Sequence, residues 1–475
     1  MSTPSPAASA ISRPAPFHLL LCGALVLYVY RIYVIGANLS LLRVVLAAWT
    51  IAALAGLVRG RTPLTRWHVA LGALSAAVVA LNAIDFAGLG AYPALRRDIV
   101  NHIQNVWLTV LLALHLRSHA QVLSLLAAFV WSSVLTSAIT VASWVLGALP
   151  FEGWLRAHSG PASAHLPFLG YDVYFNRATA AFYDPNFYGI YSALVILVAL
   201  GLWILVERRR WLLWLAAINV FFLSATLSRT GLMALLGGLG VAFFTWRSSA
   251  GSGPASTTTG RRLLAATAVV ACVCFLAGHA VQSKANRAWA ATWWLGPRVA
   301  ADPALAEGLK AQRAGPPHDE DRLSGSASVN DRFRRIRNGW NVFLSSPWLG
   351  RGGASLLRPD FPPHASAHLV YLTLLARYGI VGTLVYAAFA LAPLVAIAGR
   401  RGPPIDAIVV AAAAYWALVF VSYDVFLSFE IVYLFLGLAW ALAGLPVRRL
   451  TRNEAFAAAA PALPVLRHRT DARRV

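Results

Sequence analysis

One histidine, one aspartate and several arginines in this sequence are residues that group-transfer chemistry commonly uses. His368 stands at the start of an apolar run, where an imidazole that titrates near neutral pH can act as a general base. Asp424 is the alternative base, or a carboxylate that orients an arginine. Structural roles are the other interpretation, because an arginine can anchor a loop and a histidine can close the start of a helix. The guanidinium groups that suit an anion such as a diphosphate are those of Arg177, Arg229, Arg332 and Arg335.

Four further polar residues stand beside these groups and are expected to support them. Asp184 and Asn186 are expected to hold a neighbouring arginine and the start of a helix rather than to touch a substrate. His364 offers a second imidazole one helical turn before His368, and Arg377 follows deeper in the same run. The sequence shows no Walker phosphate loop and no zinc-ligand spacing. We therefore expect neither a metal nor another cofactor.

The elements that must position these residues are membrane-spanning helices. Of the 475 residues, 59% are hydrophobic and only 12% are charged, about half the charged fraction of a soluble protein. This composition excludes a soluble enzyme. We predict an all-α, polytopic membrane protein, because a helix crosses the bilayer with about 20 apolar residues. The 12 apolar stretches are 17–35, 39–58, 67–89, 99–116, 121–149, 182–206, 211–227, 230–246, 263–283, 367–397, 405–424 and 427–445.

These stretches divide the chain into tails, helical groups and loops. The first stretch is interpreted as a retained span because it lacks a small-residue cleavage site. The expected segments are a disordered cytoplasmic tail (1–16), helices one to five (17–149), a periplasmic loop (150–181), helices six to nine (182–283), a large periplasmic loop (284–366), helices ten to twelve (367–445) and a basic cytoplasmic tail (446–475).

The basic residues indicate the orientation of these helices. Lys and Arg number 40 against 18 Asp and Glu, a net charge of +22 that in a soluble protein would suggest nucleic-acid binding. Here the short loops on the side of the termini, such as 59–66, 207–210 and 399–402, are arginine-rich, and the short loops opposite are not. The positive-inside rule therefore predicts that both termini are cytoplasmic. Membrane lipids are then the expected partners, and nucleic acid is not.

The large loop contains an amphipathic helix pattern. Val329, Phe333, Ile336, Trp340 and Phe343 follow one another at spacings of four, three, four and three residues. Asn330 or Asp331 is expected to cap the start of this helix. The pattern is typical of a helix at a membrane interface, whose basic residues contact lipid phosphates. Those on the polar side are Arg332, Arg334, Arg335 and Arg337.

Ionisable and polar residues within the spans gather in the half that faces outward. Charge inside a membrane is costly unless it is paired or hydrated, and such residues commonly mark functional sites. Singly, each has a simpler explanation: Arg31 or Arg43 could reach lipid headgroups, and Asp85 could pair with one of them. Together they predict a polar cavity that opens to the outer leaflet and favours an anion. The main examples are Arg31, Arg43, Asp85, Asn101, His102, Gln104, Asn105 and Arg377.

Four segments, in this order, resemble motifs of the O-antigen ligase and polymerase superfamily of bacterial envelope glycosyltransferases. The first is similar to an "R…DPN" motif, the second to an "SRG" turn with an inserted Thr, the third to "R…PxxGxG" and the fourth to "HNxYL…GIIG". They are Arg177 to Gly189 with Asp184-Pro185-Asn186, Leu227 to Gly231, Arg332 with Pro347 to Gly352, and His368 to Gly382. Two positions depart from the motifs, because Leu369 replaces a polar residue and Arg377 stands where an acid is common.

The resemblance implies transfer of a glycan from undecaprenyl diphosphate to an acceptor hydroxyl, such as that of lipid A-core. The reaction would take place at the periplasmic face of the bacterial inner membrane, without ATP or an obligatory metal. Members of the same superfamily are O-antigen or exopolysaccharide polymerases and protein O-oligosaccharyltransferases, and no residue here separates these activities. A transporter of lipid-linked sugars would need polar groups through both leaflets. A non-catalytic envelope scaffold would leave the ordered motifs unexplained.

Overall fold

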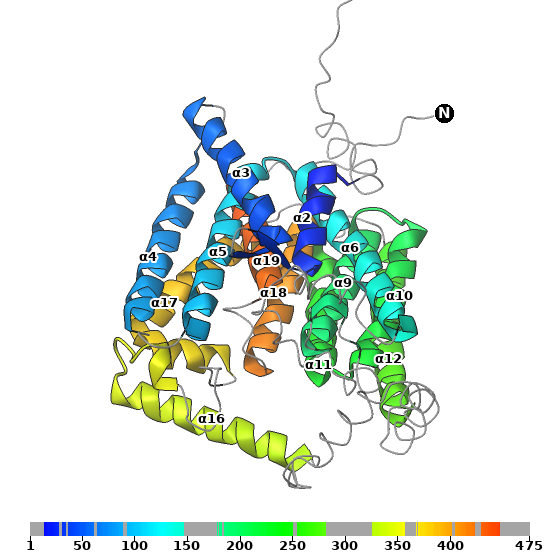
Figure 1. Cartoon of the computed structure of the whole chain (residues 1–475). Helices are drawn as coiled ribbons and strands as arrows, with labels where there is room; N and C mark the ends of the chain where they lie inside the picture. The colour runs from blue at the N-terminus through cyan, green and yellow to red at the C-terminus, as the bar shows by residue number, and fades with distance from the viewer. Residues whose placement is uncertain are drawn as a thin grey trace, which may run out of the picture.

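Each of the apolar stretches expected from the sequence contains a helix in the computed structural model (Figure 1). The structure describes residues 14–27, 31–34, 37–60, 64–88, 93–146, 178, 180–182, 185–249, 254–281, 325–356, 367, 369–400, 404–422 and 429–446. The helices along the bundle are α2 (Pro16–Val26), α3 (Leu41–Val58), α4 (Arg66–Gly88), α5 (Pro93–His115), α6 (His119–Leu146), α9 (Pro185–Leu205), α10 (Arg210–Thr226), α11 (Arg229–Ser249), α12 (Pro254–Val281), α17 (Val370–Ala398), α18 (Pro404–Ser422) and α19 (Glu430–Gly444).

Among the described residues, eight helices are long and apolar enough to cross a membrane. Shorter apolar helices are α2, α10 and α19. The helix α5 has 23 residues, and its first two turns contain Arg96, Arg97 and Asp98. The prediction of an all-α membrane protein is therefore confirmed, whereas the count of about 12 spans is not. The eight long helices are α3, α4, α6, α9, α11, α12, α17 and α18.

The first expected span, 17–35, is wrong as a continuous helix. Its helix, α2, ends at Val26, and a short hairpin follows in which β1 (Arg31–Val34) pairs antiparallel with β2 (Ala37–Ser40). The reason lies in the residues of β1, because aromatic and β-branched side chains such as Tyr33 and Val34 favour an extended backbone. The hairpin leads directly into α3, whose first turn is capped by the Ser40 side chain accepting the backbone N–H of Arg43 at 3.3 Å.

The core of the bundle lies around α9 and α19, and lipid-facing helices surround it. Every residue of α9 from Tyr188 to Leu202 is buried. The Tyr415 hydroxyl of α18 donates to the carbonyl of Ile190 at 2.6 Å, and the Trp440 indole of α19 donates to that of Phe389 at 3.0 Å. In contrast, α3, α4, α12 and α17 expose many apolar side chains, as expected for helices that contact hydrocarbon.

Two short 3-10 helices and one amphipathic helix complete the described helical elements. The short η3 (Ala180–Phe182) precedes α9, and η4 (Gly353–Leu356) precedes α17. The expected amphipathic helix is confirmed as α16 (Gly325–Ser345), which lies across one end of the bundle (Figure 1). The capping role predicted for Asn330 or Asp331 is wrong, because the helix begins at Gly325 and both residues lie inside it.

The end of α17 farthest from α16 is fixed by an arginine. Arg400 donates from Nε to a carboxylate oxygen of Asp406 at 2.9 Å, in the first turn of α18. The same guanidinium donates to the carbonyls of Leu442 at 2.7 Å and Leu445 at 3.2 Å, at the end of α19. One cation thus neutralises an acid and satisfies carbonyl groups that the end of a helix leaves unpaired.

Candidate functional site

The four motif segments meet in pairs. In the first pair, the chain before α9 lies against the last turn of α10, where the N–H of Ala178 donates to the carbonyl of Ala225 at 2.9 Å. Gly231 packs so closely that a Cβ there would lie 2.8 Å from the backbone carbonyl of Gly189, and a Cβ on Gly189 would overlap Ser228. The small residues of the two motifs therefore allow the starts of α9 and α11 to touch.

In the second pair, the backbone of the loop 347–352 is hydrogen-bonded to the backbone of α17. Arg351 N–H donates to the carbonyl of Ala376 at 2.9 Å, and Gly352 N–H donates to that of Arg377 at 2.9 Å. In return, Ile380 N–H donates to the carbonyl of Pro347 at 2.8 Å. The contact is possible because α17 is interrupted at Gly379, which has φ +63° and ψ −167°. This kink exposes backbone groups that an unbroken helix would keep for itself.

A buried ion pair anchors the same segment to α4. Arg377 donates to one carboxylate oxygen of Asp85 from Nε at 3.0 Å and from Nη2 at 2.6 Å. The other oxygen of Asp85 accepts the N–H of Gly353 at 2.7 Å. Asp85 therefore pairs with Arg377 and not with Arg43, the alternative considered from the sequence: Arg43 instead donates to Gln104 at 2.9 Å and to Asn101 at 2.7 Å. Both oxygens of a buried carboxylate are thus bonded, which offsets its desolvation.

Next to this ion pair lies a buried layer of amide, imidazole and phenol groups. The Asn82 carbonyl oxygen contacts the His102 Nδ1 at 2.9 Å and accepts the Tyr378 hydroxyl at 3.2 Å. The Asn82 amide donates to the Tyr386 hydroxyl at 2.7 Å, and the His102 ring stacks on that of Tyr386. Asn82, His102, Tyr378 and Tyr386 are buried and bond to one another, so they stabilise the junction of α4, α5 and α17 rather than line an open cavity.

The described site residues lie at the end of the bundle that carries these motif contacts. Arg229 is the first residue of α11 and its side chain is exposed, and Asn186 is half-buried in the first turn of α9. Arg335 is half-buried on α16, and Arg332 lies in the same helix with its side chain outside the described part. The residues that lie outside the described part altogether are Arg177, Asp184, His364, His368 and Asp424.

The helix α16 approaches the start of α17 through a glycine. A Cβ on Gly339 would lie 2.6 Å from the Cβ of Ala367 and 3.2 Å from the side chain of Leu372. Arg335 stands one helical turn before Gly339 on the same face of α16. The residue after Ala367 in the chain is His368. This packing places an arginine of α16 on the side of the helix that faces the chain around the predicted base.

The starts of several helices converge at this end. The Phe187 ring of α9 stacks on Phe429, the residue before α19, with ring centroids 5.0 Å apart. The Phe429 ring also packs edge to face with that of Trp416 in α18, with ring centroids 5.9 Å apart. Together with the contact of α9 and α11, this brings the N-terminal ends of α9, α11 and α19 near one another. Helix N-termini carry partial positive charge, and the first turn of α19 also holds the buried carboxylate of Glu430.

One family of known proteins matches part of this helical bundle. Residues 214–387 match the family described as O-antigen ligase. This match supports the O-antigen ligase superfamily for that part of the chain. The O-antigen ligase match covers α10 to α12, α16 and the first half of α17, and so it includes Arg229, Arg332, Arg335 and His368. Arg177, Asp184 and Asp424 lie outside it. No curated protein sequence matches the chain.

The O-antigen ligase motifs gain a structural explanation that the sequence alone did not give. The glycines of "PxxGxG" and "GIIG" are needed where the loop backbone meets the kinked helix, and the Asp85–Arg377 pair holds that junction. The signal in the sequence was an acid, Asp85, and a cation, Arg377, both predicted in the outward half of their spans. It could not name the pairing, because several arginines lie at similar depth.

Proposed function

We propose that this membrane enzyme of the O-antigen ligase and polymerase family transfers a glycan from undecaprenyl diphosphate to an acceptor hydroxyl, that of lipid A-core being our first choice. The reaction would take place at the periplasmic face of the bacterial inner membrane, with both termini in the cytoplasm. The observation that carries the proposal is the docking of α16 and the loop 347–352 onto α17 within the region that matches the family.

The proposed chemistry is a single displacement at the anomeric carbon of the donor sugar. His368 accepts the proton of the acceptor hydroxyl as its oxygen bonds to that carbon, and the bond from the carbon to the diphosphate oxygen breaks. Negative charge develops on the departing diphosphate, so cations placed there stabilise the transition state. Arg229, Arg335, Arg332 and Arg177 are the proposed diphosphate ligands, and no metal takes part. Asp424 is the reserve base.

The exposed position of Arg229 and the placement of Arg335 support these roles. Arg229 begins α11 beside the start of α9, where two helix dipoles add to its charge. Arg335 is half-buried next to the packed Gly339, whereas Arg337 is exposed on the same helix. A ligand for a diphosphate held between α16 and α17 should lie on the side of α16 that holds Arg335 and Gly339, and not on the side that holds Arg337.

This difference gives a matched test on one helix. In a strain that lacks the gene, a plasmid copy carrying Arg335→Gln should restore glycan transfer poorly, with activity lowered about tenfold or more, because a charge-assisted contact is lost. Arg337→Gln, expressed at the same level, should restore it fully. Equal restoration by both variants would remove Arg335 from the site.

The acceptor is identified by what accumulates in the same strain. A ligase predicts that long chains remain on the lipid carrier and that lipid A-core stays bare. A polymerase predicts single repeats attached to lipid A-core, and a protein glycosyltransferase predicts loss of glycan from proteins with lipid A-core unchanged. Either of the last two results would replace the ligase proposal by the corresponding alternative.

A further inference from the structure

A long apolar groove runs along α3, in a part of the chain that the proposed reaction does not use. Its cavity of about 790 Å³ is bounded by α2, α3, α5 and the start of α6. This volume falls in the range of about 300 to 1,000 Å³ that is usual for small-molecule sites. All of its lining residues precede residue 122, so the groove lies outside the region 214–387 that matches the O-antigen ligase family.

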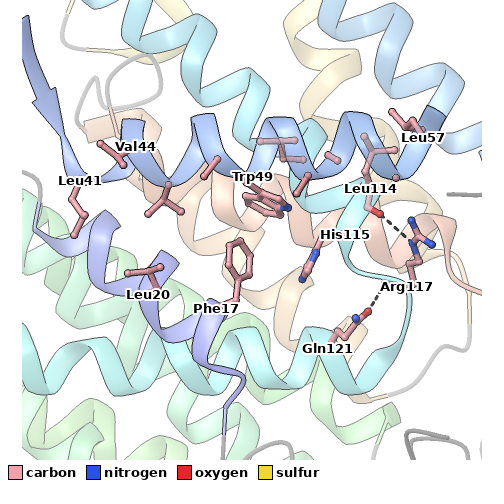
Figure 2. A pocket seen from close by; sticks show the side chains of 16 residues that line it. Phe17, Leu20, Leu41, Val44, Trp49, Leu57, Leu114, His115, Arg117 and Gln121 are labelled. Carbon is pink, nitrogen blue, oxygen red and sulfur yellow. Dashed lines mark hydrogen bonds between the residues drawn. The ribbon is translucent and has the colours of Figure 1, made fainter. Parts of the chain in front are cut away.

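The groove has a recessed floor and a firm wall. The floor is one side of α3, where the small residues Ala48, Ala52 and Gly56 follow at one-turn spacing. The wall is a cluster of the rings of Phe17, Trp49 and His115 (Figure 2). The centroid of the Phe17 ring lies 4.8 Å from that of Trp49 and 5.2 Å from that of His115. The packing of these rings ties α2 to α3 and α5 beside the floor.

The two ends of the groove differ in polarity. At one end lie Leu41 and Val44, and at the other, beside Leu57, lie Arg117 and Gln121 (Figure 2). The Arg117 side chain is exposed, and its Nε donates to the carbonyl of Leu114 at 3.3 Å. Its backbone N–H donates to the Gln121 side chain at 2.7 Å. These bonds hold a cation at the mouth of an apolar channel that follows α3 for about 24 Å.

We propose that this groove binds an anionic phospholipid, with an acyl chain along α3 and the phosphate at Arg117. An apolar channel with one cationic end complements an amphiphile with one anionic end, and arginine suits phosphate oxygens. By the proposed topology, Arg117 lies at the cytoplasmic end of the helices. The donor diphosphate is proposed at the opposite end, so the donor is not the occupant of this groove.

The test is native mass spectrometry of the full-length protein in detergent, titrated with phosphatidylglycerol or with phosphatidylcholine of the same acyl chains. The wild type should bind one phosphatidylglycerol saturably and about five- to tenfold more tightly than phosphatidylcholine, because only the first carries net negative charge. Ala52→Trp fills the floor and should abolish this site. Ala266→Trp, an exposed alanine of α12, is its control and should bind as the wild type does.

The second pair of variants tests the charge of Arg117 and leaves the apolar floor of the groove unchanged. Arg117→Gln should remove the preference for phosphatidylglycerol, whereas Arg262→Gln, an exposed arginine of α12, should keep it. Binding that is unchanged in both Ala52→Trp and Arg117→Gln would overturn the proposal. So would equal binding of the two lipids by the wild type.

Discussion

At the scale of single residues, two glycines decide how closely the loop 347–352 approaches α17. Gly350 and Gly379 both have positive φ, and a Cβ on either would overlap the backbone of the other segment. The small residues of the motifs are therefore explained by contact between backbones. The chemistry proposed for His368 and the arginines depends on this contact, because it fixes the chain that leads into α17.

Gly379→Ala should lower both stability and transfer. The added Cβ meets the Trp348 backbone and the residue must keep a left-handed φ, which costs about 1 to 3 kcal/mol. The thermal unfolding midpoint in detergent and the transfer rate both report it. Gly240→Ala in α11, where nothing lies within 4 Å, is the control and should leave both unchanged or slightly raise the midpoint. Wild-type behaviour of Gly379→Ala would show that the two backbones are not in contact.

The Asp85–Arg377 pair gives a second prediction at this scale. Asp85→Asn leaves the buried guanidinium without its counter-charge, and losing one partner of such a pair costs about 3 to 5 kcal/mol. The unfolding midpoint should fall sharply. The double variant Asp85→Asn with Arg377→Gln removes the orphaned charge and should recover part of the loss. A single variant as stable as the wild type would argue against the buried pair.

At the scale of elements, apolar run length predicts where helices lie but not how their ends are made. The pairing of β1 with β2 and the start of α16 at Gly325 both differ from expectation, because hydrophobicity does not encode where a helix begins or ends, and β-branched residues favour an extended backbone. Likewise, the sequence predicts that polar residues such as Asp85, His102 and Arg377 lie in one half of the bundle. Which of them bond to one another could not be predicted, because Asp85 and Arg377 lie on helices far apart in the sequence.

The junction of α17, α18 and α19 leads to a prediction about how the ends of these helices are held together. Arg400 lies in a loop whose basic residues were interpreted only as a signal of orientation, yet it bonds Asp406 and the end of α19. Arg400→Gln should therefore lower the free energy of unfolding by about 1 to 3 kcal/mol. Arg59→Gln, at the exposed end of α3, should change it little. Equal effects of the two substitutions on the unfolding midpoint would contradict a structural role for Arg400.

At the scale of the whole molecule, α16 and the basic loop before α10 should lie on opposite sides of the membrane. The prediction is tested with single cysteines introduced into a variant that lacks the three native ones. Arg337→Cys in α16 should react with a membrane-impermeant maleimide added to cells whose outer membrane is permeabilised, and Arg208→Cys should react only after lysis. Both side chains are exposed in the protein, so access is set by the membrane. The reverse pattern of labelling would invert the proposed topology.

The central claim is that this end of the bundle transfers a glycan from a lipid-linked diphosphate. The most direct measurement is the transfer rate of the purified, reconstituted protein with an undecaprenyl diphosphate-linked glycan and lipid A-core, without added ATP or metal. The wild type should form the product, and His368→Ala and Arg229→Ala, with unchanged unfolding midpoints, should each lower the rate by at least about a hundredfold. Full activity in both variants would contradict the proposed site.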